Sequence, residues 1–477
     1  MRSFTEPLLE LEEYNKLKKE LINVKGIVQV YVCIDTQKPH FMYSILVEGR
    51  SGLVVTFQEQ KARELYENYR FFDRNVVYYP PKDVLFYQSD IRGNLLTAER
   101  LLAVKALMEQ EQITVITTFD ALMDRVMPLP VIAEGVQEYA LADELDMEEV
   151  KRTLVHMGYE RNYQVESAGQ FAVRGGILDI FPLTEENPYR IELWGDEIDS
   201  IRSFDVLSQR SIENLQQVRI YPASEVVLSK ERVQRGLEKM EQEKERLYES
   251  FRKEMKTEEA HRLKTMVESL AEEVRELGQG AGLDSFLTYF ARETVSFLDY
   301  FDRENTVVFL DEPARIAEKG RVIGQEFSES MQHRLEKGYI LPGQMEAMYS
   351  GEEILAKMQM QKCVALTTLD YNVNELEIKT KYNINTRTVN PYNRSFDLLV
   401  KDLQLYRKKK YQVILLSGSG TRAKHLAEDL QAEGLNCFYS EDYDHSVQPG
   451  EVMVAYGKLK KGFEYPDLQF VVISESD

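Results

Sequence analysis

The stretch GYERNYQVESAGQFAVRGGILDIFPLTEENPYRIELWGDEIDSIRSFDVLSQR, residues 158–210, decides how this chain is organised. Apolar and polar side chains alternate along much of it, which predicts successive strands. The predicted strands are residues 171–173, 177–181 and 189–193. The turns between and after them contain Gly175-Gly176, Asn187-Pro188 and Gly195-Asp196. We therefore expect a small antiparallel module inside the chain.

Apolar strands alternate with helices on both sides of this module, which implies a parallel sheet with right-handed crossovers. The strand at Thr306–Leu310 would complete the sheet begun before residue 120, so the module would be an insertion. A long charged helical region covers residues 228–278, and strands and helices alternate again after Glu352. The expected domains are 1–125 and 216–351 as two halves of one α/β domain, 126–215 as the insertion, and 352–477 as a separate small α/β domain.

Composition limits the classes of protein that the chain can belong to. It has 477 residues, 43% of them hydrophobic, and a formal net charge of −21, which argues against strong non-specific nucleic-acid binding. No apolar run is long enough to span a bilayer, and the charged start is unlike a signal peptide. The three cysteines fit neither a disulfide framework nor a zinc motif, so we expect a reducing cytoplasm and no structural metal.

The turn after the first predicted strand lies where a phosphate-binding loop would be. A working loop needs glycines whose backbone amides hold phosphate, a lysine, and a hydroxyl for magnesium. Here the glycine positions hold Val32 and Asp35, Lys38 keeps the lysine position, and Pro39 replaces the hydroxyl residue. The loop is degenerate, so we expect no ATP hydrolysis there.

Two other segments are partial nucleotide-site features. Asp311-Glu312 ends an apolar strand, as a Walker B element would, but without a phosphate loop we favour a buried strand with a solvated acidic end. The turn from Ser417 to Thr421 is similar to a phosphate-binding strand–turn–helix, although small residues are common at helix N-termini. Whether this turn binds an anion stays open.

Several long segments together resemble a known family. They are residues 158–182, IELWGDEIDSIRSFDVLSQRSI at 191–212, and Tyr221-Pro-Ala-Ser-Glu225. They are similar to the UvrB-homology region shared by UvrB and by Mfd, the bacterial transcription-repair coupling factor. The whole chain resembles the N-terminal part of the Mfd family, which implies a degenerate RecA-like α/β domain interrupted by a UvrA-binding module.

The alternative is a UvrB-like, ATP-dependent DNA damage-binding protein. Three differences from the UvrB pattern favour Mfd. The degenerate loop at Val32–Pro39 is usual in this part of Mfd. The segment that starts at Tyr78 leaves no room for the long β-hairpin with which UvrB clamps DNA. After Asp311-Glu312 the chain enters a small α/β domain rather than a second motor domain.

The resemblance also implies the function of the whole family. Mfd releases RNA polymerase stalled at DNA lesions with an ATP-driven translocase and then recruits UvrA. The motor, with its ATP and magnesium, and the polymerase-binding domain lie C-terminal to the matching region. We therefore expect this chain, which stops at Asp477, to be a non-catalytic part of a longer protein whose C-terminal domain covers the UvrA-binding face at rest.

The resemblance places UvrA binding on Arg161, Arg174 and Phe181. Arginine and aromatic side chains are enriched at interface hot spots, which fits this role. Two alternatives remain from the residues alone: Phe181 could belong to the core, and Arg174 could pair internally with Asp179 or Glu166.

Overall fold

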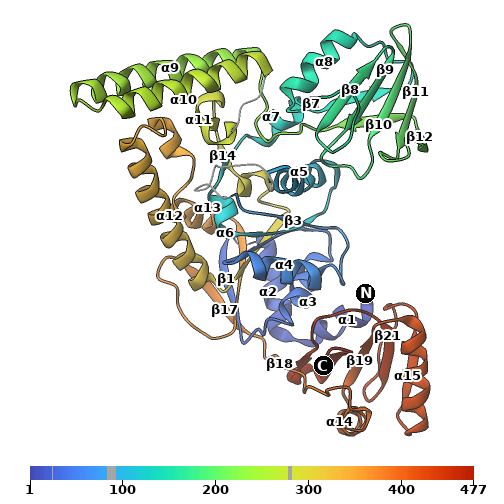
Figure 1. Ribbon diagram of the computed structural model, residues 1–477. Helices are drawn as coiled ribbons and strands as arrows, with labels where there is room; N and C mark the ends of the chain where they lie inside the picture. Colours follow the sequence, from blue (N-terminus) through green and yellow to red (C-terminus); the bar gives the residue numbers. More distant parts are fainter. Residues whose placement is uncertain (24, 83–92, 278–281) are drawn as a thin grey trace.

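The computed structural model describes residues 1–23, 25–82, 93–277 and 282–477. Figure 1 shows four parts: a parallel body in the middle, an antiparallel module above it, a projecting helical hairpin, and a C-terminal body below. This is a multi-domain α/β fold, as predicted from the alternation of strands and helices.

In the parallel body, seven described strands pair in parallel in the order β17-β1-β16-β15-β2-β4-β3. The residues of β2, β4, β15 and β16 are almost all buried, as expected for strands covered by helices on both faces, whereas edge strand β17 is largely polar and partly exposed. The strands are β1 Gly26–Tyr31, β2 Ser51–Thr56, β3 Val76–Tyr79, β4 Thr114–Thr118, β15 Thr306–Asp311, β16 Lys362–Thr367 and β17 Ile378–Asn383.

Helices cover both faces of this sheet. One face packs against α2, α3 and α4, and the other against α5, α6, α12 and α13, because alternate strand residues enter two separate cores. The helices are α1 Arg2–Thr5, α2 Glu12–Asn23, α3 Lys38–Leu46, α4 Glu59–Tyr69, α5 Gly93–Glu109, α6 Phe119–Met123, α12 Pro313–Glu336 and α13 Gly351–Gln359.

The expected boundary at residue 352 is wrong for the next two strands. β16 lies between β1 and β15 in the parallel sheet, and β17 pairs with β1. All six residues of β16 are buried, so this apolar strand is sandwiched between the helix layers of the first sheet. The second α/β sheet begins only with β18 Arg387–Thr388. The other domain boundaries stay predictions.

The antiparallel module holds a sheet of order β12-β11-β10-β9-β8-β7, and β6 pairs with β13 beside it. The pairs are antiparallel as predicted, except that the short edge strand β7 runs parallel to β8. One face of the sheet packs under α8. Its elements are β6 Gln137–Ala140, α8 Met147–His156, β7 Glu160–Arg161, β8 Gln170–Arg174, β9 Ile177–Phe181, β10 Tyr189–Trp194, β11 Glu197–Phe204, β12 Ser211–Leu215 and β13 Gln217–Ile220.

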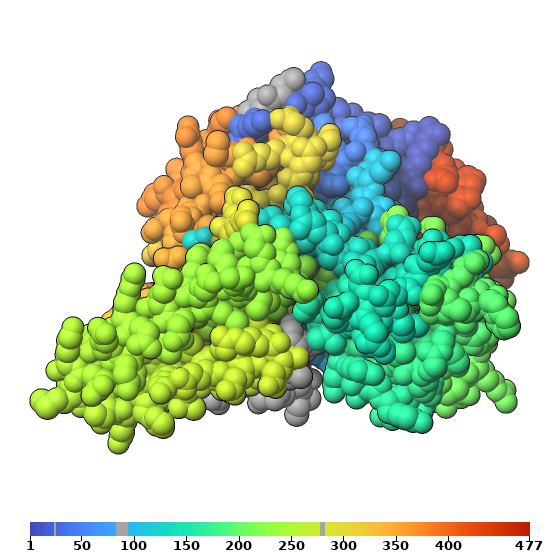
Figure 2. Space-filling view, turned by 90° about the horizontal axis from the view of Figure 1, so that it is seen from above, coloured from blue at the N-terminus to red at the C-terminus, as the bar shows by residue number. Residues whose placement is uncertain are grey.

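The charged helical region forms an antiparallel hairpin of α9 Lys230–Lys253 and α10 Thr257–Leu277. The expected helical range 228–278 reaches residue 278, which lies outside the described residues. The hairpin and the antiparallel module stand out as two lobes on one side of the molecule in Figure 2. The short elements α7 Leu129–Glu134, α11 Leu287–Phe290, β5 Arg125–Val126 and β14 Val295–Ser296 connect these parts.

The C-terminal body is a second sheet, of order β18-β22-β23-β19-β21-β20, flanked by two helices. Its remaining elements are α14 Phe396–Lys408, β19 Gln412–Ser417, α15 Gly420–Ala432, β20 Cys437–Ser440, β21 Val452–Tyr456, β22 Phe463–Tyr465 and β23 Phe470–Ser474.

A continuous hydrophobic core joins the C-terminal body to the parallel body. Phe463, Tyr465 and Phe470 pack in the same core as α3 and the first residues of the chain. His40 lies fully buried at this junction, with Nδ1 2.9 Å from the Tyr465 hydroxyl and Nε2 2.9 Å from the carbonyl oxygen of Phe4. The two bodies therefore form one packed unit. Within the described ranges, no helix has the length and apolarity needed to cross a membrane.

Candidate functional site

The sheet of the antiparallel module has one covered and one outward face. Cross-strand partners share a face, and the register places Phe171, Leu178, Ile191 and Ile201 on the covered face beneath α8. Side chains at the intervening positions point outward. The outward face is the candidate binding face.

Asp179 lies at the centre of the outward face and holds two arginines. Its carboxylate accepts bonds from Nε and Nη2 of Arg190, at 2.6 and 2.9 Å, and from Nη2 of Arg174, at 2.9 Å. Asp179 is only 1% exposed, whereas the Arg174 side chain is 35% exposed. The internal pairing of Arg174 with Asp179, left open above, is therefore present, and the guanidinium still reaches the surface.

Arg190 completes this cluster and was missed by the sequence reasoning. Besides its bidentate contact with Asp179, its guanidinium lies 4.3 Å from the ring centroid of Phe204 and donates to Gln209 at 2.9 Å. The hydrogen bonds to Asp179 raise the pKa of Arg190 above its ordinary value. The available signal was its position directly opposite Asp179 in neighbouring predicted strands.

Phe181 also lies on the outward face, at the opposite end of the β8–β9 hairpin from Arg174. It pairs with Gln170, whereas Arg174 pairs with Ile177 beside the Gly175-Gly176 turn. Phe181 is half-buried, so it is not a fully buried core residue. At about 3.3 Å per residue, the four steps from Ile177 to Phe181 extend roughly 13 Å.

Arg161 is separated from these two residues. It pairs in register with Phe171, which belongs to the covered face, and its side chain is exposed at the sheet edge. The side-chain hydrogen bond from Lys151 lowers the pKa of Glu148 on α8, and the charge of Arg161 adds to this effect. Arg161 is thus directed toward the α8 side, while Arg174 and Phe181 share the outward face.

In the degenerate phosphate loop, the lysine forms ion pairs with acidic residues of the chain itself. The Lys38 ammonium lies 2.6 Å from Asp311, 3.0 Å from Glu312 and 3.0 Å from Asp35, and its side chain is 0% exposed. Val32 stands at the first glycine position with φ of 66°. That left-handed conformation is costly for a β-branched residue and easy for glycine.

The electrostatics of this cluster favour the internal ion pairs. Burial lowers the pKa of Lys38, but the charges of Asp311, Glu312 and Asp35 outweigh burial and raise it above the ordinary lysine value. The three carboxylates lie within 4.8 Å of one another, a grouping that could hold a metal ion. The Lys38 ammonium supplies positive charge to all three instead.

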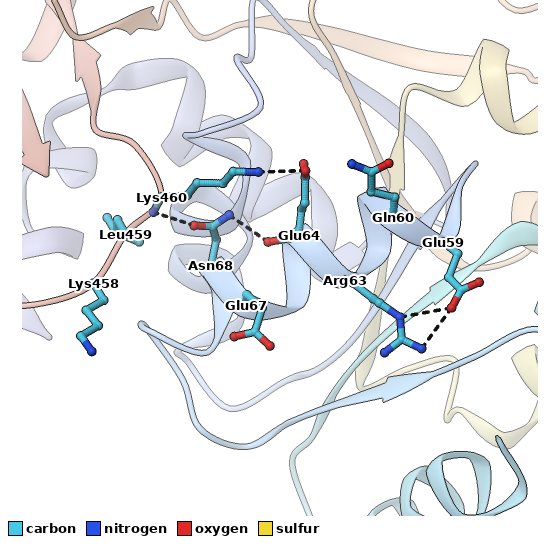
Figure 3. Close-up of a pocket in the computed structure, with 9 residues that line it drawn as sticks. All are labelled: Glu59, Gln60, Arg63, Glu64, Glu67, Asn68, Lys458, Leu459 and Lys460. Carbon is cyan, nitrogen blue, oxygen red and sulfur yellow. Dashed lines mark hydrogen bonds and ion pairs between the residues drawn. The ribbon is translucent and has the colours of Figure 1, made fainter. Parts of the chain in front are cut away.

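One cavity borders this cluster, and a second adjoins the first along α4. The first, of about 620 Å³, is lined by Asp35, Lys61, Glu312 and Arg315 among others. The second, of about 800 Å³, separates α4 from residues 458–460. Figure 3 shows two charged pairs in this cavity: Lys460 reaches Glu64 at 2.8 Å, and Arg63 reaches Glu59, while Glu67 and Lys458 are joined to no other residue drawn there. These local pairs leave no set of like charges converging on a ligand among the labelled residues.

The Ser417–Thr421 turn holds a carboxylate of the chain itself. The backbone N–H of Gly418 and the hydroxyl of Ser417 donate to Glu475, and Arg422 forms an ion pair with it at 3.1 Å. The bond from Gly418 lowers the pKa of Glu475. An anion is thus already bound at the N-terminus of α15.

The sequence of this chain is similar to known protein families. Residues 138–226 match the family described as UvrB interaction domain, a range that contains the whole six-stranded sheet of the module. The transcription-repair-coupling factor of Bacillus subtilis (strain 168) is 29% identical over 405 residues, 85% of this chain and 34% of that protein. The chain resembles the N-terminal region of the transcription-repair coupling factors. The factor of Staphylococcus haemolyticus is 27% identical over 86% of this chain and 34% of its own length.

UvrB is a second relative. The UvrABC system protein B of Thermosipho africanus is 25% identical over 90% of this chain and 70% of its own length. The chain spans about a third of the length of the coupling factors that it matches. The chain is therefore similar both to coupling factors and to a UvrB protein.

Proposed function

We propose that this chain is the UvrA-recruiting, non-catalytic part of a transcription-repair coupling factor. In such a protein, a motor elsewhere in the sequence would use ATP and magnesium to release RNA polymerase stalled at DNA lesions. The observation that carries the proposal is the match to the UvrB interaction domain over residues 138–226, whose sheet presents Arg174 and Phe181 on one outward face. Arg161 would contribute from the sheet edge.

Local physics supports Arg174 as a docking residue. Asp179 holds the guanidinium in place through Nη2, and the side chain remains 35% exposed. A held arginine loses less side-chain entropy on binding and can still face a carboxylate of a partner. Asp179 also restricts the arginine to one sector of the outward face.

The absence of catalysis in this chain is part of the same proposal. The ion pairs of Lys38 with Asp311 and Glu312 occupy the groups that would contact phosphate and magnesium, and Asp35 adds negative charge. We propose that no nucleotide and no metal bind at this loop. Calorimetry with Mg-ATP should give no saturable heat, and micromolar binding would contradict the proposal.

The alternative of a UvrB-like, ATP-dependent damage-binding protein has the UvrB likeness in its favour. Only residues 80–92 separate β3 from α5, which is too short for a long DNA-clamping hairpin. Residues 83–92 of that connection lie outside the described residues. A gel shift on lesion-bearing duplex at physiological salt separates the two functions, because tight lesion-specific binding would favour the UvrB-like one.

The main test is binding of purified UvrA to this chain and to its Arg174→Ala variant. Loss of a well-placed interface arginine should weaken binding by about 2 kcal/mol, which is roughly thirtyfold. Arg246→Ala on the exposed side of α9 is the matched control and should bind as the wild type does. Equal binding by the wild type and Arg174→Ala would remove Arg174 from the interface.

Two further parts of the proposal concern context. In a full-length coupling factor, a C-terminal domain would cover the outward face, so this chain should bind UvrA more tightly than its parent. Equal affinities would eliminate this masking. We also propose a cytoplasmic location, which agrees with three free, buried cysteines among the described residues.

A further inference from the structure

The only tryptophan of the chain lies on the outward face of the module. Trp194 ends β10, and its side chain is 85% exposed. Alternation along β10 puts Ile191 on the covered face and Arg190, Glu192 and Trp194 on the outward face. Tryptophan is buried on average, so this exposure leaves a large apolar surface in water.

Two adjoining turns place Trp194 at the same end of the sheet as Arg174. Gly195, with φ of 68°, and Asp196 form the two-residue turn after Trp194, and Gly175, with φ of 63°, starts the turn after Arg174. The N–H of Leu193 donates to the carbonyl of Gly176 at 2.8 Å, which joins the two turns side by side.

The connection before α8 fixes the Trp194 turn further. The N–H of Leu145 donates to the carbonyl of Asp196 at 2.7 Å, and Ile198 exchanges hydrogen bonds with residues 142 and 143. Because the backbone beneath Trp194 is already ordered, covering the indole costs no further backbone ordering.

The surface around Trp194 is open to a partner. A Cβ on Gly175 would meet no heavy atom within 4 Å. Arg174, before this turn, keeps part of its guanidinium in solvent. Tryptophan and arginine are both enriched at interface hot spots.

We propose that Trp194 anchors the partner protein at the Gly175-Gly176 end of the sheet. This inference rests on the proposed function, with UvrA as the occupant. The complementary surface of UvrA would offer an apolar pocket for the indole and, beside it, a carboxylate for Arg174. The indole supplies buried area, and the ion pair fixes the register of the two surfaces.

The test compares two exposed apolar residues that lie beyond the two ends of β11. Leu207 is 94% exposed and follows β11, whose eight residues separate it from the Trp194 turn by roughly 25 Å. Trp194→Ala should weaken UvrA binding at least about tenfold, as loss of a hot spot does, while Leu207→Ala binds as the wild type does. Circular dichroism checks that both variants fold.

A second readout reports directly on the indole. Hydroxytryptophan incorporated at Trp194 can be excited without exciting the tryptophans of UvrA. Acrylamide should quench its emission severalfold less once UvrA is bound, because the partner covers the ring. In the free chain, quenching should be that of an exposed indole.

The outcomes separate this inference from the proposed function. One outcome is that UvrA binds the wild type and that Arg174→Ala weakens this binding, while Trp194→Ala binds as the wild type does and UvrA does not reduce quenching. That outcome overturns the role of Trp194 as an anchor and leaves the proposed function standing. If UvrA does not bind the wild type, both fail. Dimerisation of the chain that Trp194→Ala abolishes, with no effect on UvrA binding, would assign the indole to a second copy and overturn the proposal.

Discussion

The ammonium of Lys38 lies 2.6 Å from the carboxylate of Asp311, and both side chains are fully buried. The pair joins the N-terminus of α3 to the end of β15, two segments separated by more than half of the chain. A residue type associated with phosphate binding here links the two sequence halves of one sheet.

Lys38→Met should destabilise the protein by about 3 kcal/mol or more, because it leaves Asp311 buried without its cation. Urea unfolding measures this change. Lys460→Met is the control, since its ion pair with Glu64 is exposed and should contribute less than about 1 kcal/mol. Equal effects of the two substitutions would mean that the buried pair contributes no more to stability than an exposed one.

Asp179→Ala should cost more stability than Arg174→Ala. The first leaves two guanidinium groups without their shared carboxylate, and we expect a loss of about 3 kcal/mol. The second leaves Asp179 its bidentate contact with Arg190, so the loss should stay near 1 kcal/mol. Thermal unfolding ranks the two, and the reverse order would mean that Arg190 does not satisfy Asp179 alone.

Stability should fall below neutral pH through His40. Burial lowers the pKa of His40 from 6.5 to about 4, although the bond to the carbonyl of Phe4 opposes this. Between these values the unfolded chain binds a proton that the folded chain does not, so stability is lost as pH falls from about 6.5 to 4. The full effect is about 3 kcal/mol.

Comparison with His40→Gln isolates this contribution from other titrating groups. The difference in unfolding free energy between wild type and variant should change across that pH window and stay constant above it. A difference independent of pH would show that His40 titrates normally in the folded protein.

The parallel body and the C-terminal body should unfold together. Phe463 is fully buried in the core that they share, and its ring is 4.9 Å from that of His40. Phe463→Ala should cost about 3–5 kcal/mol and accelerate amide exchange in both sheets. Phe396→Ala, at a position 37% exposed in the same body, should have little effect. Faster exchange in the C-terminal sheet alone would contradict a shared core.

The sequence by itself determined the local features. Period-two alternation and paired turn residues were enough to find β8, β9 and β10, and missing glycines marked the loop at Val32–Pro39 as degenerate. These signals depend only on near neighbours: the side-chain period of a strand and the backbone freedom of glycine.

Only the tertiary structure decided which distant segments meet. The apolar strand β16 fits either α/β sheet by its residues, and packing placed it between β1 and β15. Strand register pairs Arg161 with Phe171 of the covered face. It places Arg174 and Phe181 together on the outward face. Lys38 forms its ion pair with Asp311, which lies 273 residues away in the sequence. Pairing and burial depend on contacts between remote parts of the chain, which alternation and turn residues do not encode.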